Sequence, residues 1–331
     1  MVEHLTHRVT KALVNALHLP MDNSSRIVMM SDCHRGDGSS ADNFYGNLNI
    51  YTTALQWYEK TGYTYIELGD GDELWACKIF ANITNANAKV FDILSKFYQQ
   101  GRLYMIYGNH DIVKRERNWA RRFYYDYLVR FNDKHKLLFP NIELHESIVL
   151  DYGNTGHSIL LLHGHQVDCL NSAFWRLARF LVRYLWHPLE TWGVKNPMSP
   201  VNSPSKKGVL ESYLSDWSVR HNQMLIAGHT HRTAFPKVGE PLYFNDGCCV
   251  YPEFITALEI CGGQIGLVKW SYDTTENGLL FVNREILKEP VKLSDYFAVG
   301  SVCMEGNTKR AASNKTVLFF RKTGRMGGKQ I

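Results

Sequence analysis

Residues 103–111, LYMIYGNHD, combine the two features that decide the fold of this chain: a short apolar run and, directly after it, a group of metal-binding residue types. The same arrangement occurs at residues 26–34, RIVMMSDCH, and at residues 63–73, YTYIELGDGDE. Two further apolar runs, 158–162 and 224–227, end in HGH and GHTH. Short apolar runs bounded by glycine or polar turns are typical of buried strands. The sequence therefore predicts five such strands, each ending in polar, metal-binding residues.

Segments with helical periodicity separate the first three predicted strands. They lie at residues 45–60 and 86–100, and the resulting alternation of strand, helix and strand is typical of an α/β sheet. Residues 241–270 instead predict several antiparallel strands around turns at 245–247 and 261–263. The predicted fold class is therefore α/β.

The sequence also predicts how the chain divides. A helical segment occupies residues 1–25, and a helical cap with helices at about 171–186 and 209–221 is inserted into the main domain, 26–275. Apolar periodicity weakens from about residue 275, so we expect residues 276–331 to form a peripheral or partly disordered extension with a basic tail.

Composition excludes several classes of protein. Hydrophobic residues make up 45% of the 331 residues and charged residues 21%, which is ordinary for a globular protein and excludes collagenous, coiled-coil and largely disordered chains. Seven cysteines without framework spacing favour reduced thiols and a cytoplasmic location. No apolar run approaches the roughly 18 residues of a membrane-spanning helix.

The net charge of +5 comes from one end of the chain. Residues 309–331 contain seven Lys or Arg residues and no acid, so the remainder is close to neutral. We expect this tail either to keep the chain soluble or to contact anionic partners.

The strand-end residues are predicted to converge on one site. Ligands of open α/β sheets bind beyond the carboxyl ends of the strands. In extended backbone, residues i and i+2 point to the same side, so Asp32 with His34, and His229 with His231, are expected to share a centre. Cys33 then points away, into the core. Nitrogen and oxygen donors suit manganese, iron or zinc.

These motifs resemble the calcineurin-like metallophosphoesterase superfamily, whose pattern is D-x-H, GD-x-x-D/E, GNH-D/E, a histidine before glycine, and GH-x-H. All five motifs occur, over about residues 26–271. Within the superfamily the chain is similar to the UDP-2,3-diacylglucosamine pyrophosphatase-like branch in its basic, aromatic insertion and in residues 228–232, GHTHR. It differs at His110, where that branch usually carries Arg, and in the tail. The resemblance implies a four-layered α/β/β/α sandwich with two divalent metal ions, manganese first, with iron or zinc as alternatives.

The resemblance also implies a role for each motif residue. One ion would be held by Asp32, His34, Asp70 and His231, and the other by Asp70, Asn109, His163 and His229. Asp70 would thus bridge the two ions.

Four further residues have implied roles around these ligands. Glu73 would support them from outside, and His165 would orient substrate or support a ligand. His110 would stabilise the transition state or protonate the leaving oxygen, and Asp111 would hold His110 in place.

Several basic residues are candidates for selecting the substrate. Arg115 follows the Asn-His-Asp motif and Arg232 follows the last histidine. Arg176, Arg179 and Arg183 share one face of the predicted cap helix, beside an apolar stripe. We expect this helix to cap an amphiphilic substrate, to contact an anionic membrane surface peripherally, or to pack its apolar stripe on the domain.

We therefore expect a binuclear metal-dependent phosphoesterase that hydrolyses a phosphomonoester, phosphodiester or pyrophosphate bond by a metal-bridging hydroxide. Its expected partner is a phosphorylated small molecule or amphiphile. Two alternatives stay open: a catalytically silent metal-site scaffold that binds protein partners, and a nuclease of the same superfamily. Nucleic acid is less favoured, because the basic residues form no long stripe beside the site. The sequence leaves the oligomeric state open.

Overall fold

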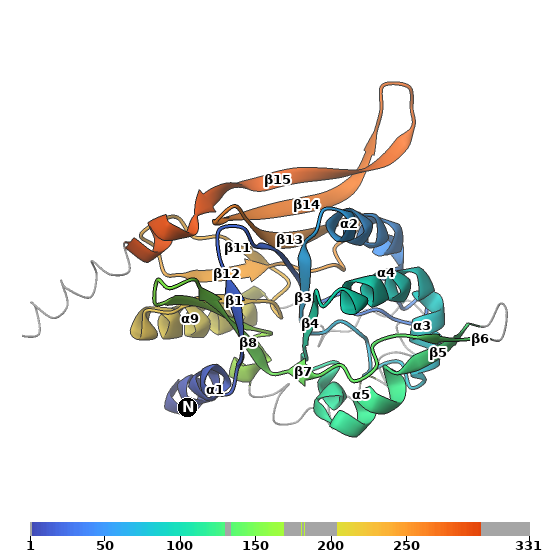
Figure 1. Cartoon of the computed structure of the whole chain (residues 1–331), viewed down its shortest axis with the longest axis horizontal. Helices are drawn as coiled ribbons and strands as arrows, with labels where there is room; N and C mark the ends of the chain where they lie inside the picture. The colour runs from blue at the N-terminus through green and yellow to red at the C-terminus, as the bar shows by residue number, and fades with distance from the viewer. Residues whose placement is uncertain (1, 130–133, 169–179, 181, 183–203, 299–331) are drawn as a thin grey trace, which may run out of the picture.

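Two β-sheets pack face to face, and helices cover the outer face of each sheet, in a computed structural model of the chain (Figure 1). The structure describes residues 2–129, 134–168 and 204–298, together with residues 180 and 182. The predicted α/β class and the four-layered α/β/β/α sandwich are confirmed. Most of the predicted cap and the basic tail lie outside the described residues.

The larger sheet carries three of the predicted strand-end motifs. Its strand order is β15 (Leu280–Lys292), β14 (Gln264–Thr274), β13 (Phe254–Cys261), β2 (Arg26–Met30), β3 (Thr64–Leu68), β4 (Leu103–Ile106) and β7 (Leu144–His145). From β2 to β7 the strands are parallel, so the motifs after β2, β3 and β4 emerge at the same edge.

The second sheet has six strands and carries the other two motifs. Its order is β1 (Leu17–Met21), β8 (Ser147–Tyr152), β9 (His157–Leu162), β10 (Met224–Ala227), β12 (Tyr243–Asp246) and β11 (Thr233–Ala234). Strands β9, β10 and β12 are parallel, so the two histidine motifs also leave one edge together. A separate hairpin consists of β5 (Asp126–Val129) and β6 (Lys134–Leu137).

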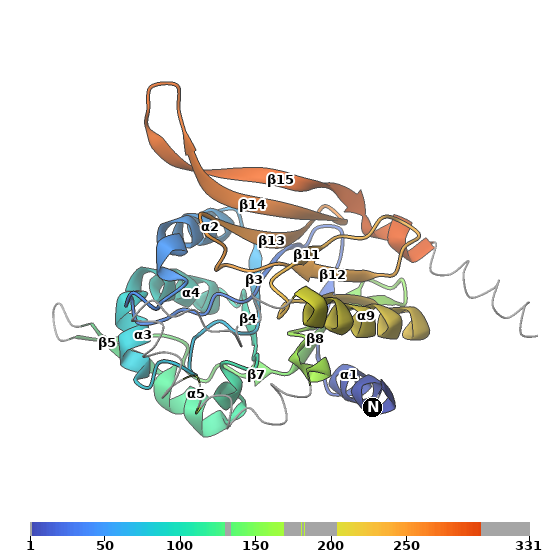
Figure 2. The same cartoon turned by 180° about the vertical axis from the view of Figure 1, so that it is seen from behind.

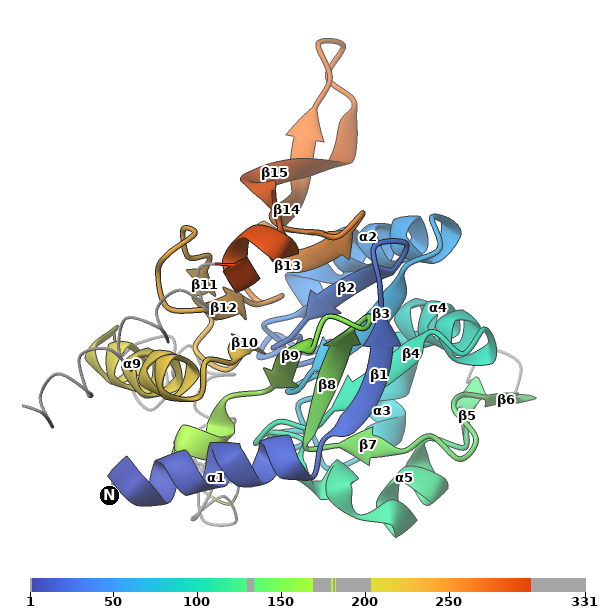
Figure 3. The same cartoon turned by 60° about the vertical axis from the view of Figure 1, so that its left-hand side comes forward.

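The helices are divided between the two outer faces. The seven-stranded sheet is covered by α2 (Leu48–Lys60), α3 (Phe80–Ala86) and α4 (Ala88–Gln99), and the six-stranded sheet by α1 (Val2–Val14) and α9 (Pro204–His221) (Figure 3). Short elements complete the chain: α5 (Arg117–Phe123) and the 3-10 helices η1 (Tyr45–Asn47), η2 (Ile112–Arg115) and η3 (His165–Val167). Helix α9 includes the second predicted helix, 209–221, and its Leu214 and Trp217 pack on the six-stranded sheet.

Side-chain alternation explains why the layers hold together. Ile27 and Met29 of β2 lie in the core between the sheets, whereas Val28 and Met30 lie in the core beneath the helices. Successive residues of a strand point to opposite faces, so a strand covered on both faces must be apolar throughout. The predicted buried strands satisfy this requirement.

Three expectations from the sequence are corrected. Residues 1–25 are not only helical, because β1 joins the edge of the six-stranded sheet. The predicted boundary at 275–276 falls in the β14–β15 hairpin, which extends well beyond the body (Figure 2). Residues 293–298 then form a short helix. The predicted antiparallel block is also only partly antiparallel, since β12 pairs in parallel with β10. No helix in the described part of the chain is long and apolar enough to cross a membrane.

Candidate metal centre

The backbone turns sharply where each motif leaves its strand. Asp32, His34, Asp70, His229 and His231 all have positive φ, between 47° and 70°, a region that non-glycine residues rarely adopt. The predicted extended backbone at 32–34 and 229–231 is therefore wrong. The side chains still converge, because the left-handed residues turn the loops back over the strand ends.

Glycine lets the loops approach each other closely. A Cβ atom at Gly108 would lie 2.1 Å from Asp70 Oδ1 and 2.6 Å from the Asp70 nitrogen. The loops after β3 and β4 are therefore in direct contact at this point, and the Gly-Asn-His-Asp motif needs its glycine to bring Asn109 beside Asp70.

One group of donor atoms forms between the two sheets at Asp32. Its Oδ1 lies 3.0 Å from His231 Nε2 and 3.7 Å from His34 Nε2. His34 Nε2 lies 3.8 Å from Asp70 Oδ2. Donor atoms bound to one cation at about 2.0–2.2 Å lie roughly 3–3.6 Å apart. The spacing of these atoms therefore fits a single divalent ion.

A second group forms on the other side of Asp70. Asp70 Oδ2 lies 3.2 Å from His163 Nε2, and donor atoms of Asp70, His163 and His229 all fall within 4.8 Å of one another. Asn109 follows β4 and is 1% exposed. Asp70 therefore lies between the two groups, near His34 on one side and His163 on the other.

Several of these atoms are buried without a hydrogen-bond partner in the described part of the chain. They are Asp32 Oδ1, Asn109 Oδ1 and Nδ2, His163 Nε2 and His231 Nδ1. Buried polar atoms are rarely left unpaired, because desolvation is costly. Carboxylate, amide and imidazole donors in such positions suit divalent cations, so the residues present fit two such ions.

Hydrogen bonds from outside fix the orientation of the donors. Asp32 Oδ2 accepts from the His229 nitrogen (2.8 Å) and lies 2.5 Å from Ser31 Oγ, which leaves Oδ1 facing the site. His163 Nδ1 donates to the Leu68 carbonyl (2.8 Å), so Nε2 is the nitrogen that is left to face the site. Asp70 Oδ1 accepts from the His110 nitrogen (2.7 Å), which leaves Oδ2 for the site.

Charge interactions inside the site are strong. Burial alone would raise the pKa of Asp70, but His163 and His110 hold it far below its ordinary value. Burial alone would lower the pKa of His163, yet Asp70 and Asp32 raise it to about 9. Asp70 is therefore a carboxylate at any physiological pH, as a bridging ligand must be.

Glu73 connects His34 and His110. Its Oε2 lies 3.0 Å from His34 Nδ1 and 2.8 Å from His110 Nδ1, and its Oε1 accepts from the nitrogens of Trp75 and Ala76 at 3.1 Å. The His110 ring also stacks on Trp75, with ring centres 4.1 Å apart. Glu73 thus orients both imidazoles, and the opposite nitrogen of each ring, Nε2, is the one that can meet a ligand.

The role predicted for Asp111 is wrong. Asp111 does not hold the His110 ring, which is held by Glu73. Its carboxylate instead accepts from the nitrogens of Gly108 (2.7 Å) and Gly71 (3.1 Å) and from Lys114 Nζ (2.6 Å). Asp111 therefore joins the loops that follow β3 and β4.

Beneath these loops lies a buried network of charges whose pairing no sequence motif marks. Lys114 Nζ lies 2.9 Å from Asp72 Oδ2, and Arg35 pairs with Asp72 (2.7 Å) and Glu67 (2.6 Å). Together with Asp111, all are at most 1% exposed. Lys114, directly before the substrate candidate Arg115, therefore faces inward and has a structural role.

The remaining residues predicted to support a ligand or contact the substrate are His165 and five arginines. His165 is 3% exposed and its ring lies between those of His163 and Tyr107, so it fits the supporting role better than contact with substrate. Arg115 and Arg232 are exposed. Arg176, Arg179 and Arg183 lie outside the described residues, so their role stays a prediction.

Two contacts of the site were missed at the level of sequence. Asp168 Oδ2 lies 3.2 Å from His229 Nε2; it stands five residues after His163, where no motif marks it. Asp246, at the end of β12, has Oδ1 2.8 Å from Ser31 Oγ. Burial, with the nearby Asp32 carboxylate, raises the pKa of Asp246 well above its ordinary value.

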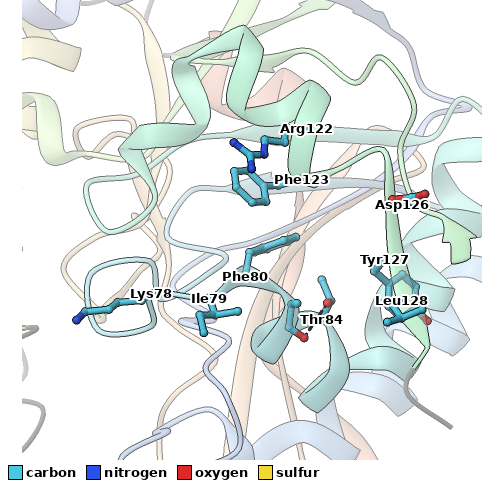
Figure 4. A pocket seen from close by; sticks show the side chains of 10 residues that line it. Lys78, Ile79, Phe80, Thr84, Arg122, Phe123, Asp126, Tyr127 and Leu128 are labelled. Carbon is cyan, nitrogen blue, oxygen red and sulfur yellow. Dashed lines mark hydrogen bonds between the residues drawn. The ribbon is translucent and has the colours of Figure 1, made fainter. Parts of the chain in front are cut away.

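A separate cavity of about 370 Å³ lies between α3, the end of α5 and β5 (Figure 4). Phe80, Phe123 and Tyr127 give it aromatic walls, and Lys78 and Arg122 are its cations. None of its lining residues belongs to the donor groups, so it is distinct from the metal centre.

Known proteins resemble the chain at two levels. A family model described as calcineurin-like phosphoesterase matches residues 25–233, a span that contains every proposed donor. Vacuolar Protein Sorting 29 from Cryptosporidium parvum is 14% identical, with a TM-score of 0.34, over 80% of this chain and 98% of that one. Vps29 from Chaetomium thermophilum is 12% identical, with a TM-score of 0.38, over 81% and 99%. No curated protein sequence matches the chain.

Proposed function

Because the chain belongs to the calcineurin-like phosphoesterase family, we propose that it is an active phosphoesterase that works with two divalent metal ions. The observation that supports this proposal is the grouping of donor atoms: those of Asp32, His34 and His231, and those of Asp70, His163 and His229, lie within 4.8 Å of one another in each group, and several are buried without a hydrogen-bond partner in the described part of the chain. The ions are manganese in this proposal, with iron or zinc as alternatives of similar ligand preference.

The residues would divide between the ions around Asp70. Asp32, His34 and His231 would hold one ion and Asn109, His163 and His229 the other, with Asp70 shared. Bound there, divalent ions would neutralise phosphoryl oxygens and lower the pKa of water.

The chain itself contributes orientation and a proton donor. Glu73 holds His110 through Nδ1 (2.8 Å), and Trp75 stacks on the ring. His110 Nε2 is then the atom that would donate to the phosphoryl group or to the leaving oxygen. Hydrolysis adds water to phosphorus, breaks the bond to the leaving oxygen and returns a proton to that oxygen.

A silent scaffold is the competing function. Scaffolding has no chemical need for His110, for its Glu73 contact or for a full donor set, and all three are present. The site therefore favours turnover over binding alone.

The test is hydrolysis by metal-stripped protein with and without added manganese. A phosphomonoester, a phosphodiester and a nucleoside diphosphate sugar would serve as substrates. We expect turnover that requires manganese and is lost in Asp70→Asn, which keeps the shape of the side chain but removes its charge. Asp151→Asn, at a surface position of β8, is the matched control and should retain activity.

The result separates the two functions. Two bound manganese ions per chain with no hydrolysis of any of the three substrates would refute the proposal and favour the scaffold.

A further inference from the structure

The cavity between α3, α5 and β5 has the lining of a small-molecule site. Its volume is about 370 Å³, within the roughly 300–1,000 Å³ that such sites occupy. Apolar and aromatic side chains make up most of the lining, with a few polar and charged groups among them, and this composition is usual for a site that binds an organic ligand. No lining residue belongs to the donor groups of the metal centre, so the proposed phosphoesterase function leaves this cavity unused.

Three aromatic rings form the walls of the cavity. Phe80 is the first residue of α3, Phe123 is the last residue of α5, and Tyr127 lies on β5 (Figure 4). The Phe80 and Phe123 rings lie nearly edge to face, with ring centres 6.2 Å apart. Aromatic rings attract further rings in edge-to-face and offset-stacked arrangements. These walls therefore favour a flat aromatic body over an aliphatic chain.

Contacts behind the walls hold the rings in place. Phe80 packs edge to face on Trp119 and on Tyr124, with ring centres 5.3 Å and 5.4 Å apart. The Tyr127 hydroxyl donates to Asp92 Oδ1 (3.0 Å) on α4. Phe80 and Tyr127 are both buried. The cavity is therefore formed before a ligand arrives, which lowers the entropic cost of binding.

Two cations give the cavity a positive rim. Lys78 and Arg122 line it and are exposed. The Arg122 guanidinium lies over the Phe123 ring, 5.3 Å from the ring centre, so this cation stands directly beside an aromatic wall. The carboxylate of the lining, Asp126, has its Oδ2 3.0 Å from His135 Nδ1. With two cations and one carboxylate, the lining has a net positive charge and favours an anion.

We propose that this cavity binds an aromatic carboxylate with two fused rings, its rings between the aromatic walls and its carboxylate on Arg122. A cavity of about 150 Å³ holds one benzene molecule, so a volume of about 370 Å³ has room for two rings and a carboxylate. A guanidinium can donate two parallel hydrogen bonds to a carboxylate, which makes Arg122 a better anchor than Lys78. The site is separate from the proposed phosphoesterase function, and its test needs no turnover.

The experiment measures binding of 2-naphthoate to the manganese-loaded full chain by calorimetry. Two compounds separate the contributions of charge and rings: 2-naphthamide has the same rings without the charge, and octanoate has the charge without the rings. Wild type should bind one 2-naphthoate per chain. Because a hydrogen bond to a charged group contributes about 10- to 100-fold, 2-naphthamide should bind at least about 10-fold more weakly. Octanoate should also bind more weakly, since it cannot stack on the walls.

Two variants test where 2-naphthoate binds. Arg122→Met should lower the affinity for 2-naphthoate by about 10-fold and leave the affinity for 2-naphthamide unchanged. Ala81→Phe adds a ring at an exposed position of the lining and should weaken binding of both compounds by filling the cavity. The matched control is Arg121→Met, which removes the preceding exposed cation of α5, outside the lining, and should bind both compounds as wild type does. Circular dichroism checks that each variant is folded.

Each outcome either supports or overturns the site. If wild type does not bind 2-naphthoate, or binds octanoate equally well, the proposed ligand class is wrong. If Arg122→Met and Ala81→Phe both bind 2-naphthoate as wild type does, the compound lies elsewhere, for example on the manganese ions, and the site is wrong. Hydrolysis assays judge the phosphoesterase function separately, because 2-naphthoate has no phosphate and the variants lie outside the metal centre.

Discussion

Removing the buried ammonium of Lys114 should destabilise the protein and loosen the metal centre together. Lys114 is 1% exposed, and its Nζ lies 2.6 Å from Asp111 and 2.9 Å from Asp72. Lys114→Met would leave Asp111 and Asp72 without this cation. Breaking a buried charge pair by removing one partner costs about 3–5 kcal/mol. Each kcal/mol lost from the free energy of unfolding lowers Tm by about 2–4 °C in chains of 150–250 residues, and by less in larger ones. At about 2 °C per kcal/mol, Lys114→Met should lower Tm by about 6–10 °C.

The matched control is the exposed pair of Lys136 with Asp92. Their atoms lie 2.5 Å apart, but the side chains are 48% and 38% exposed. Exposed pairs contribute less than about 1 kcal/mol, so Lys136→Met should move Tm by only a degree or two. Thermal unfolding of both variants by circular dichroism makes the comparison. Equal Tm values for the two variants would refute the structural role of Lys114.

The effect of pH on the Tm difference between wild type and Lys114→Met follows from the direction in which the pKa of Lys114 is shifted. Burial alone would lower the pKa of Lys114, but Asp111 and Asp72 raise it well above its ordinary value. A raised pKa gives stability that is fully present below the unfolded value of about 10.4 and is lost as pH rises through the folded value. The Tm difference between wild type and Lys114→Met should therefore stay constant from about pH 6 to pH 9.

The same variant should weaken metal binding. Asp111 holds the loop that presents Asn109, through the nitrogens of Gly108 and Gly71. Loss of an outer partner of a metal site typically costs about 10- to 100-fold in affinity or activity. Manganese affinity of Lys114→Met, measured by calorimetry below its Tm, should fall by about 10-fold. An unchanged affinity would show that the network stabilises the fold without positioning the loop.

Three further predictions concern single side chains. Glu73→Gln should lower manganese affinity or turnover by about 10- to 100-fold, because it weakens the contact to two imidazoles. The control Glu285→Gln, on exposed β15, should leave both as in the wild type. If the two variants behave alike, Glu73 has no positioning role. Asp168→Asn should reduce manganese affinity by a similar factor through His229, as dialysis equilibrium would show, and full retention of the metal would contradict this. Cys33→Ala should lower the free energy of unfolding by roughly 1 kcal/mol, and Tm by a few degrees, through lost core packing. Elemental analysis should still find two ions per chain. Loss of metal would instead show that Cys33 is a ligand.

The strand-end motifs could be predicted because their signal is local. An apolar run such as 103–106 requires burial on both faces, and the polar residues directly after it must then lie at a sheet edge. That reasoning placed Asp70 and Asn109 near each other before any contact was known. It needed no knowledge of how the loops bend, and for that reason the left-handed backbone at Asp32 and His34 was not foreseen.

The partners of these residues could not be predicted, because they depend on tertiary distances. Glu73 and Asp111 are both acidic motif residues that could contact His110. Only the packing of the loops shows that Glu73 contacts the His110 imidazole and that Asp111 contacts Lys114. Strand β15 was missed for another reason. Most of its residues are exposed, so its sequence lacks the alternation that marks a half-buried strand.

The division of the ligands between the two sheets has a mechanical consequence. Asp70 follows β3 of the seven-stranded sheet, whereas His163 and His229 follow β9 and β10 of the six-stranded sheet. Ions held by these residues would cross-link the two sheets, since the sheets could not separate while the ions stayed bound. Resistance to unfolding would then rise with the free manganese concentration. Under the proposed function, a cell short of manganese would hold a protein that is both inactive and easier for proteases to degrade.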